Sequence, residues 1–399
     1  MQFSQITGQQ EAKEQLVSMV RQNRLGHALL LLGKEGTGSL PLAVALTQYL
    51  VCEKVSGISS NSSQSLFGSE EDTKSIPLDA CGVCAACVKA EQLVHPDIHF
   101  SYPVIPRKAG DKPVSTDYIK EWREFIKIYP YGNVYDWLQF IGAENKQGNI
   151  TAHECNDIIR KLNLKSFESG YKIVLMWMPE YLGNEGNKLL KLIEEPPPNT
   201  LFILVANDES QILQTILSRT QLIKIPALET ADIEKALVER AKVAPEQARQ
   251  IASISEGNYR EALQLINHAE EDWQSLLREW LNAALKTGPV AQAKWVDEIS
   301  KLGREKQKQF LRYFNHLLEL AVRLRIAGSE APINIADNER DFALRLNKIS
   351  TLSQQYAIVE EIDKATYYIE RNANAKMLFL ALTIKLYHII TDHSVPEMA

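Results

Sequence analysis

Long apolar stretches are missing from this sequence of 399 residues. The longest apolar runs cover residues 28–32, 173–178 and 201–206, and none approaches the roughly 20 residues that a membrane-spanning helix needs. The first fifteen residues, MQFSQITGQQEAKEQ, also lack the basic segment followed by an apolar one that marks a secretory signal. We therefore expect a cytoplasmic protein with no membrane segment.

An excess of positive charge is missing as well. Lysine and arginine total 44 against 50 aspartates and glutamates, which gives a formal net charge of −6. Because a protein that grips DNA alone usually presents a broad basic surface, this balance disfavours a solitary DNA-binding protein. It still allows a share in a DNA-handling complex. Hydrophobic residues make up 45% and charged residues 24%, as is typical of a folded chain with two or three domains.

What the sequence does contain is an alternation of strands and helices. A predicted strand runs straight into a glycine-rich turn at 33–38, and a helix follows the turn. Strands are predicted at 27–32, 172–177, 201–206 and 223–225. This order predicts an α/β fold with a parallel sheet covered on both faces. From about residue 231 the pattern becomes wholly helical.

The glycine turn follows the pattern of a phosphate-binding loop but lacks its chemistry. A working loop reads G-x-x-x-x-G-K-[ST], where the lysine neutralises phosphate oxygens and the hydroxyl helps to hold Mg²⁺. Gly33, Gly36 and Gly38 are in place here. Ser39 stands at the lysine position and Leu40 at the hydroxyl position, and a leucine cannot coordinate a metal ion.

The strand at 172–177 lacks the second nucleotide-handling element. In hydrolysing relatives of this pattern, a buried strand ends in acidic residues that position Mg²⁺ and the attacking water. Trp177 and Met178 occupy those places, and Glu180 comes only after Pro179. Two separate losses therefore predict a nucleotide-binding fold without hydrolytic machinery.

Three of the five cysteines form a tight group. Cys81, Cys84 and Cys87 have the spacing C-x₂-C-x₂-C, which lets sulfurs converge on one tetrahedral ion. Cys52, at the end of the preceding predicted helix, is the best fourth ligand, although 28 residues separate it from Cys81. Much of this insert, residues 53–80, is rich in serine, glycine and acidic residues and is predicted to be a flexible excursion. We expect a closed, structural zinc site.

Other readings of the cysteines stay open. His95 and His99 are alternative fourth ligands. An iron–sulfur cluster is a competitor, but Cys87 is not followed by the C-x₃-C-P continuation of that motif. Cys155 is expected to be a small buried apolar residue on a helix over 151–162.

Several stretches, in the right order along nearly the whole chain, resemble the AAA+ clamp-loader subunits of bacterial DNA polymerase III. The run L-L-K-x-x-E-E-P-P followed by Ser-Arg is highly specific in combination. The matching stretches are RLGHA at 24–28, the glycine loop, NKLLKLIEEPP at 187–197, the strand at 201–206, SRT at 218–220, GNYREAL at 257–263 and RNANA at 371–375.

The resemblance implies roles for two arginines. Arg219 corresponds to the family's arginine finger, which reaches ATP bound by the neighbouring subunit, although Thr220 replaces the family's cysteine. Arg260 corresponds to the lid residue that contacts nucleotide in active members. The glycine loop, with Ser39 at the lysine position, is expected to bind no nucleotide. A structural ion pair is therefore an equal alternative for Arg260.

The resemblance also implies an organisation and a set of partners. We expect a RecA-like AAA+ domain over 1–227 with a zinc module at about 52–100, a helical lid over 228–270, and a helical collar for oligomerisation over 271–399. The expected partners are clamp-loader ATPase subunits, the delta subunit, the sliding clamp, and primed DNA through the complex. The expected location is the bacterial cytoplasm, at the nucleoid-associated replisome, with ATP only at the neighbour's site.

Two alternative functions stay open at this point. The chain is either an active ATPase of the same family or a stand-alone zinc-containing nucleic-acid-binding protein. Basic residues Arg160, Lys161 and Lys165 could reach DNA phosphates, although a solvated helix face is the commoner meaning of such a group. The aromatic-rich stretch at 118–140 is compatible with core, insert packing or a partner surface.

Overall fold

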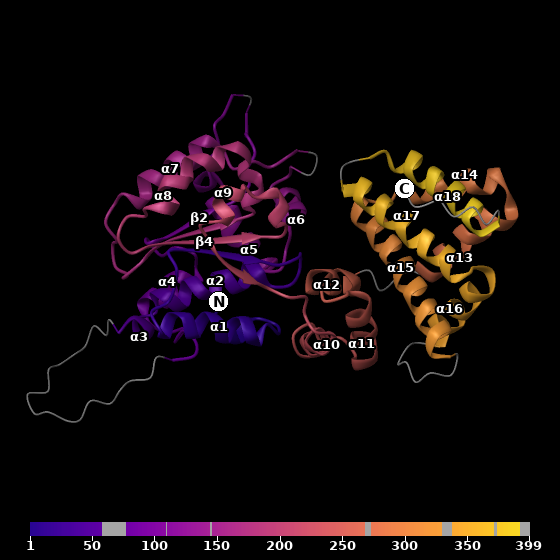
Figure 1. Ribbon diagram of the computed structural model, residues 1–399, viewed down its shortest axis with the longest axis horizontal. Coiled ribbons are helices and arrows are strands. Elements are labelled where there is room, and N and C mark those ends of the chain that lie inside the picture. The colour runs from indigo at the N-terminus through magenta and orange to yellow at the C-terminus, as the bar shows by residue number, and fades with distance from the viewer. Residues whose placement is uncertain are drawn as a thin grey trace, which may run out of the picture. The chain divides into compact units, whose positions relative to one another are not determined.

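The computed structural model divides into two compact units, Met1–Gln264 and Leu265–Ala399 (Figure 1). It describes residues 1–57, 77–108, 110–143, 146–267, 273–328, 337–370 and 373–391. Most of the predicted flexible excursion, residues 58–76, lies outside the described residues. The predicted boundaries at 227 and 270 stay predictions, since the division between the units falls within α12 (Tyr259–Asn267).

The first unit is built on a five-stranded parallel sheet in the order β2-β3-β4-β1-β5. Its strands are β1 (Ala28–Leu32), β2 (Ile98–Ser101), β3 (Lys172–Trp177), β4 (Thr200–Ala206) and β5 (Gln221–Lys224). The predicted α/β class is confirmed. Strand β2 was missed by the sequence analysis because its apolar signal is only Ile98 and Phe100.

Helices cover both faces of this sheet, as Figure 1 shows. On one face lie α1 (Gln10–Arg21), α2 (Ser39–Val51), α4 (Ala85–Glu91), α5 (Ile119–Ile128) and α6 (Val134–Phe140). On the other lie α7 (Ala152–Leu162), α8 (Asn187–Glu194) and α9 (Gln214–Leu217). Alternate residues of β1 separate accordingly: Leu29 and Leu31 join the first core and Ala28 and Leu30 the second. Strands with both faces buried explain why the apolar runs are continuous.

Most aromatic side chains of the stretch at 118–140 belong to the core, although Tyr129 is 48% exposed. Trp122 of α5 and Trp137 of α6 are both fully buried. Trp122 stacks on Tyr102 with 4.0 Å between ring centroids, and Trp137 meets Trp122 edge-on at 5.4 Å. Trp177, at the end of β3, joins the same cluster at 5.3 Å from Trp122. Trp177, which the sequence places where an acid was expected, is a packing residue in this structure.

The remaining elements are helical, apart from connecting turns. The first unit continues with α10 (Thr230–Glu239), α11 (Pro245–Ile254) and most of α12. Short helical turns in this unit are η1 (Phe3–Gln5), α3 (Glu53–Ser56), η2 (Ser115–Tyr118), η3 (Pro179–Gly186) and η4 (Glu209–Gln211). The second unit contains α13 (Trp273–Asn282), the π-helix η5 (Ala283–Thr287), α14 (Pro289–Ile299), α15 (Arg304–Ala327), α16 (Asp337–Ile349), α17 (Leu352–Glu370) and α18 (Ala375–Thr391). Within the described residues, none of the helices is long and apolar enough to cross a membrane.

Replacing Trp137 with alanine tests the role of the aromatic cluster. The substitution removes a fully buried indole whose Nε1 donates a hydrogen bond to the carbonyl oxygen of Pro103 over 2.7 Å. We expect the free energy of unfolding to fall by about 3–5 kcal/mol, measured by urea denaturation. The matched control is Phe167→Ala, at a side chain that is 81% exposed, and it should change stability by less than about 0.5 kcal/mol. Equal effects of the two variants would contradict a core role.

Candidate functional site

Two hydroxyl groups of the glycine loop between β1 and α2 turn towards each other inside the loop. The Thr37 hydroxyl donates to the carbonyl oxygen of Lys34 over 2.8 Å and lies 3.2 Å from the Ser39 hydroxyl. A Cβ atom at Gly33 would lie 2.5 Å from that Ser39 oxygen. Gly33 is therefore needed because two hydroxyl groups turn inward against it.

Residues that precede and begin α12 pack on this loop from the outside. The Gly36 carbonyl accepts a hydrogen bond from the Tyr259 N–H at 3.1 Å. Gly36 has φ +70°, and a Cβ there would lie 1.8 Å from Oδ1 of Asn258, so a side chain is excluded both by conformation and by space. Gly33, Gly36, Gly38 and Ser39 are all buried.

Arg260 forms a buried ion pair with a residue of the aromatic stretch. Its Nε lies 2.5 Å from Oδ2 of Asp136, and its Nη2 lies 2.6 Å from Oδ1. The Arg260 side chain is 5% exposed. This is the structural ion-pair alternative that the sequence left open, and it fastens α12 to α6.

The Glu180 side chain is hydrogen-bonded to backbone N–H groups at the carboxyl edge of the sheet. Its Oε1 accepts hydrogen bonds from the N–H groups of Asn207 and Asp208, at 2.6 and 3.0 Å. Burial raises the pKa of the Glu180 carboxyl, against the lowering effect of those N–H groups. The acid nearest to the end of β3 therefore joins the ends of β3 and β4.

Arg219 lies between α9 and β5 and forms an ion pair with a nearby carboxylate. It pairs with Glu194 at the end of α8, and its Nη1 also donates to the carbonyl oxygen of Thr215 over 2.8 Å. The Arg219 side chain is about one-third exposed. The guanidinium is held near the surface of the first unit by groups that its own chain supplies.

Four cysteine side chains form a cluster in the first unit. Cys52, Cys81, Cys84 and Cys87 place their Sγ atoms within 4.8 Å of one another, and no disulfide joins them. The Sγ atoms of Cys81 and Cys87 are 3.8 Å apart. A tetrahedral zinc site with Zn–S bonds of about 2.3 Å has sulfur–sulfur edges of about 3.8 Å, so the spacing fits a four-coordinate ion.

The backbone around these sulfurs favours thiolates. The N–H groups of Cys81, Cys84 and Cys87 donate to the sulfurs of Cys52, Cys81 and Cys84 respectively, at 3.3 to 3.4 Å. Burial opposes ionisation of Cys81, but N–H groups of Val83 and Cys84 outweigh it and lower its pKa to about 7. Burial raises the pKa of both Cys84 and Cys87. Four close sulfurs with this donor set can hold a metal ion, whose charge would favour the thiolate form.

The amino terminus packs against the segment that leads to the cysteines. The Asp79 carboxylate accepts hydrogen bonds from the N–H groups of Phe3 and Ser4 at 3.0 and 2.9 Å. The Tyr49 hydroxyl donates to the carbonyl oxygen of Pro77 over 2.7 Å. The segment at 77–79 that leads to the cysteine triplet is thereby attached to the first core. The sequence alone could not show this connection, because it joins residues far apart in the chain.

The other residues that the sequence singled out lie apart from the cysteine cluster. His95 and His99, the alternative ligands, are not among the groups that converge there. The buried Cys155 thiol donates to the carbonyl oxygen of Glu185 over 3.7 Å, and burial raises its pKa to about 11. On α7, Arg160 and Lys161 both pair with Asp157, at 2.5 and 2.6 Å, as on an ordinary solvated helix face.

The partly buried His99 makes stability sensitive to acid. Burial and the nearby charge of Lys161 lower the pKa of His99 to about 4 from its ordinary value of 6.5. Below pH 6.5 the unfolded chain therefore binds more protons at this site than the folded chain. We expect His99→Asn to remove roughly 2–3 kcal/mol of the stability loss between pH 6.5 and pH 4, measured by urea denaturation across that range. His153→Asn, at an exposed histidine of α7, is the control, and an equal change in the two profiles would contradict this assignment.

The sheet order, the glycine loop that follows β1 and the small helical segment packed on that loop define an α/β protein of the AAA+ class. The family model described as "DNA polymerase III, delta subunit" matches residues 8–229, which is more than half of the chain. The chain belongs to this family, and the predicted resemblance to clamp-loader subunits is confirmed.

Individual relatives agree with this membership at modest identity. The delta' subunit of DNA polymerase III from Bacillus subtilis is 26% identical over 255 residues, which cover 64% of this chain and 58% of that protein. The delta' subunit from Escherichia coli is 24% identical over 311 residues, covering 78% of this chain and 74% of that protein. Among solved structures, one similar chain is a DNA polymerase III gamma subunit-related protein from Thermotoga maritima, with 14% identity and a TM-score of 0.38. The match spans 94% of this chain and 99% of that protein.

Proposed function

We propose that this chain is a non-hydrolysing, delta'-type subunit of a bacterial DNA polymerase III clamp loader. It supplies Arg219 to ATP bound by a neighbouring subunit and helps to load the sliding clamp onto primed DNA. Its partners are the ATPase subunits and the delta subunit, with the clamp and DNA engaged through the assembly in the cytoplasm. The observation that carries this proposal is the glycine loop, which the chain fills and covers with its own groups.

Three features support the loss of hydrolysis. Ser39 replaces the phosphate-binding lysine, and its hydroxyl turns inward against Thr37. Trp177 lies in an aromatic cluster where an acid would be needed for Mg²⁺. Arg260, which could otherwise meet a phosphate, is satisfied by both oxygens of Asp136. Binding ATP would require opening the contact between Gly36 and the Asn258–Tyr259 pair.

The surroundings of Arg219 support a role towards a neighbour. A guanidinium stays charged and can bridge two phosphate oxygens, and Glu194 already shows that the Arg219 fork accepts an anionic partner. Exchange of an exposed carboxylate for phosphate costs little, because an exposed ion pair of this kind contributes only about 0–1 kcal/mol. The stabilisation of transition-state charge by such a trans arginine is worth about 10³–10⁵ in rate.

Removing Arg219 should disable one ATP site of the assembly. In a reconstituted loader we expect Arg219→Ala to slow DNA-stimulated hydrolysis at the shared site by about 10³-fold, because the transition-state charge loses its partner. The measurement is the amplitude of the rapid phosphate-release phase. This amplitude should fall by the amount that one ATP site contributes, while the contribution of the remaining sites is unchanged. Arg219→Lys should also be slow, since lysine keeps the charge but lacks the planar fork.

Matched variants separate this role from a general loss of structure. Arg249 is another exposed arginine paired with a glutamate, Glu234, at 3.3 Å, so Arg249→Ala should leave the phosphate-release phase unchanged. Glu194→Gln should retain it, because it frees Arg219 without removing the guanidinium. An unchanged amplitude in Arg219→Ala would refute the finger. Stabilisation of the isolated chain by Mg²⁺–ATP would instead favour the alternative of an active ATPase subunit.

We further propose that Cys52, Cys81, Cys84 and Cys87 hold a structural zinc ion. Four thiolates close a tetrahedral site and leave no position for a reacting water. The ion would therefore join the end of α2 to the start of α4 and the turn before it, without taking part in chemistry. Four sulfurs of this kind also suit an iron–sulfur cluster, which is the competitor that the test must distinguish.

Metal analysis tests this assignment directly. Protein purified without chelator should contain about one zinc per chain and no iron, and Cys84→Ser should lose the metal and lower the melting temperature, because the closed site loses a ligand. Cys155→Ser is the control at a cysteine outside the cluster and should keep the zinc. Iron with visible absorption, or no metal at all, would rule zinc out.

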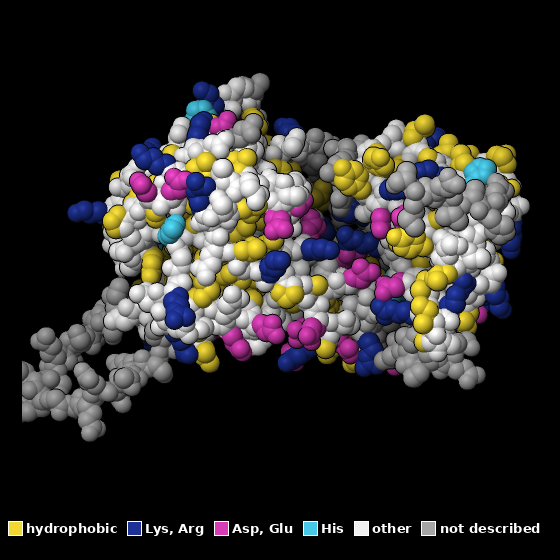
Figure 2. Space-filling model, viewed as in Figure 1, with side chains coloured by type: hydrophobic (Ala, Val, Ile, Leu, Met, Phe, Trp, Pro, Cys, Tyr) yellow, Lys and Arg dark blue, Asp and Glu magenta, His cyan; other side chains and the backbone are white. Residues whose placement is uncertain are grey.

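The distribution of charge argues against the stand-alone nucleic-acid-binding alternative. On the face of the first unit seen in Figure 2, basic side chains are interspersed with acidic ones. The chain as a whole carries a formal charge of −6. Since non-specific DNA binding rests on contacts between many basic groups and phosphates, DNA binding is expected to need the basic surfaces of other subunits.

A further inference from the structure

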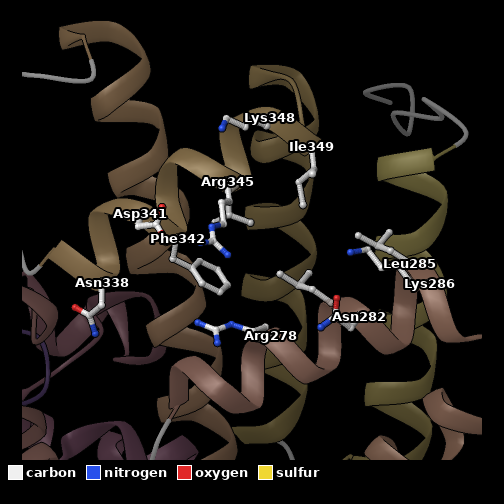
Figure 3. Close-up of a pocket in the computed structure, with 12 residues that line it drawn as sticks. Arg278, Asn282, Leu285, Lys286, Asn338, Asp341, Phe342, Arg345, Lys348 and Ile349 are labelled. Atoms are coloured by element: carbon white, nitrogen blue, oxygen red, sulfur yellow. Dashed lines mark ion pairs between the residues drawn. The ribbon is translucent and has the colours of Figure 1, made fainter.

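A pocket in the second unit has a composition that none of the roles above uses. Its volume is about 460 Å³, within the range of small-molecule and side-chain binding sites. It is lined by α13, the π-helix η5 and α16 (Figure 3).

The floor of the pocket is apolar. Leu281 of α13 and Phe342 and Leu346 of α16 line it and are buried to at least nine-tenths. Leu285 is half-buried, and Ile349 is 44% exposed at the rim. Apolar side chains from a ligand would therefore find both a buried surface and partly exposed aliphatic groups that gain from being covered.

The rim of the pocket is basic. Arg278, Lys286 and Lys348 are exposed and have no ion-pair partner among the described residues. The one acid in the lining, Asp341, is already paired with the fourth cation, Arg345, at 2.7 Å. Figure 3 shows Arg278 on α13 and Arg345 on the facing α16. Unpaired cations around an apolar hollow are unexpected in a chain with net charge −6.

One wall of the pocket has an unusual backbone. Residues Ala283–Thr287 form a π-helix directly after α13, and Leu285 and Lys286 lie on it. Single π-turns are rare, cost stability and occur frequently at functional sites. This turn contributes one apolar and one basic group to the same hollow.

We propose that this pocket binds an acidic, amphipathic peptide segment of a partner protein. The apolar side chains of the segment occupy the hollow, and its carboxylates pair with Arg278, Lys286 and Lys348. The charge of the rim selects an anionic ligand, and the apolar floor selects a peptide over a nucleic acid. Phe342 is only 8% exposed, so it offers no open face on which a base could stack. This inference does not depend on the role of Arg219 or on the cysteines.

A labelled synthetic helix tests the proposal with the full-length chain. The probe is a fluorescein-labelled peptide of about 16 residues, with glutamates on one face and leucines at i, i+3 and i+4 spacing on the other. Fluorescence anisotropy should report saturable binding that weakens as salt is raised, because exposed charge pairs are screened. Arg278→Glu combined with Lys286→Glu should weaken binding at least about tenfold. Leu285→Ser should weaken it too, while leaving its salt dependence in place.

Control variants and control ligands decide between outcomes. Lys294→Glu combined with Lys301→Glu reverses two exposed charges outside the pocket and should leave the affinity unchanged. Melting temperatures of all variants show whether each remains folded. Absence of saturable peptide binding overturns the proposal. So does equal loss in the pocket and control variants, equal binding of a peptide whose leucines are replaced by alanine, or preferential binding of a thymidine oligonucleotide at the pocket.

Discussion

The buried ion pair between Arg260 and Asp136 is the interaction on which the arrangement of the first unit depends. It joins α12 to α6 through two hydrogen bonds, in a place where the arginine is 5% exposed. Breaking such a pair from one side leaves an uncompensated buried charge, at a cost of about 3–5 kcal/mol. Because Asn258 and Tyr259 immediately precede Arg260, the same pair presses them onto Gly36. The ion pair and the contacts of Asn258 and Tyr259 with Gly36 therefore hold the start of α12 against the glycine loop together.

The contacts around the glycine loop bear on the proposed loss of hydrolysis. In a hydrolysing protein, the glycine loop, the acid at the strand end and the arginine near α12 all respond to nucleotide. Here the residues at or near these places have partners from the chain itself. Ser39 lies beside Thr37, and Arg260 pairs with Asp136. Glu180, beyond the end of β3, accepts hydrogen bonds from the N–H groups of Asn207 and Asp208. Surface groups on a unit held in this way are already ordered. Ordered groups lose less conformational entropy when they bind a neighbouring protein.

The sequence alone predicted those features of the fold that depend on residues close together in the chain. Apolar runs identified four strands, and the replaced residues Ser39, Leu40 and Trp177 were readable from position alone. Strand β2 could not be found in this way because two apolar residues in four resemble any loop. The ion pair of Arg260 could not be chosen over its alternative, because Asp136 is 124 residues away and only the fold brings it close. The convergence of Cys52 with the distant triplet was proposed from residue type, while the N–H groups that favour thiolates needed the backbone.

Net charge turned out to be a poor guide to local chemistry in this chain. A value of −6 disfavours a broad DNA-binding surface, yet it averages over regions of opposite character. The pocket bordered by Arg278, Lys286 and Lys348 is locally basic, and its cations lack partners among the described residues. Long-range screening limits the influence of distant acids to about 8–10 Å at physiological salt, so a ligand in the pocket responds to the rim and not to the total. A chain that is acidic overall can therefore still present a locally basic pocket of the kind that the proposed acidic segment requires.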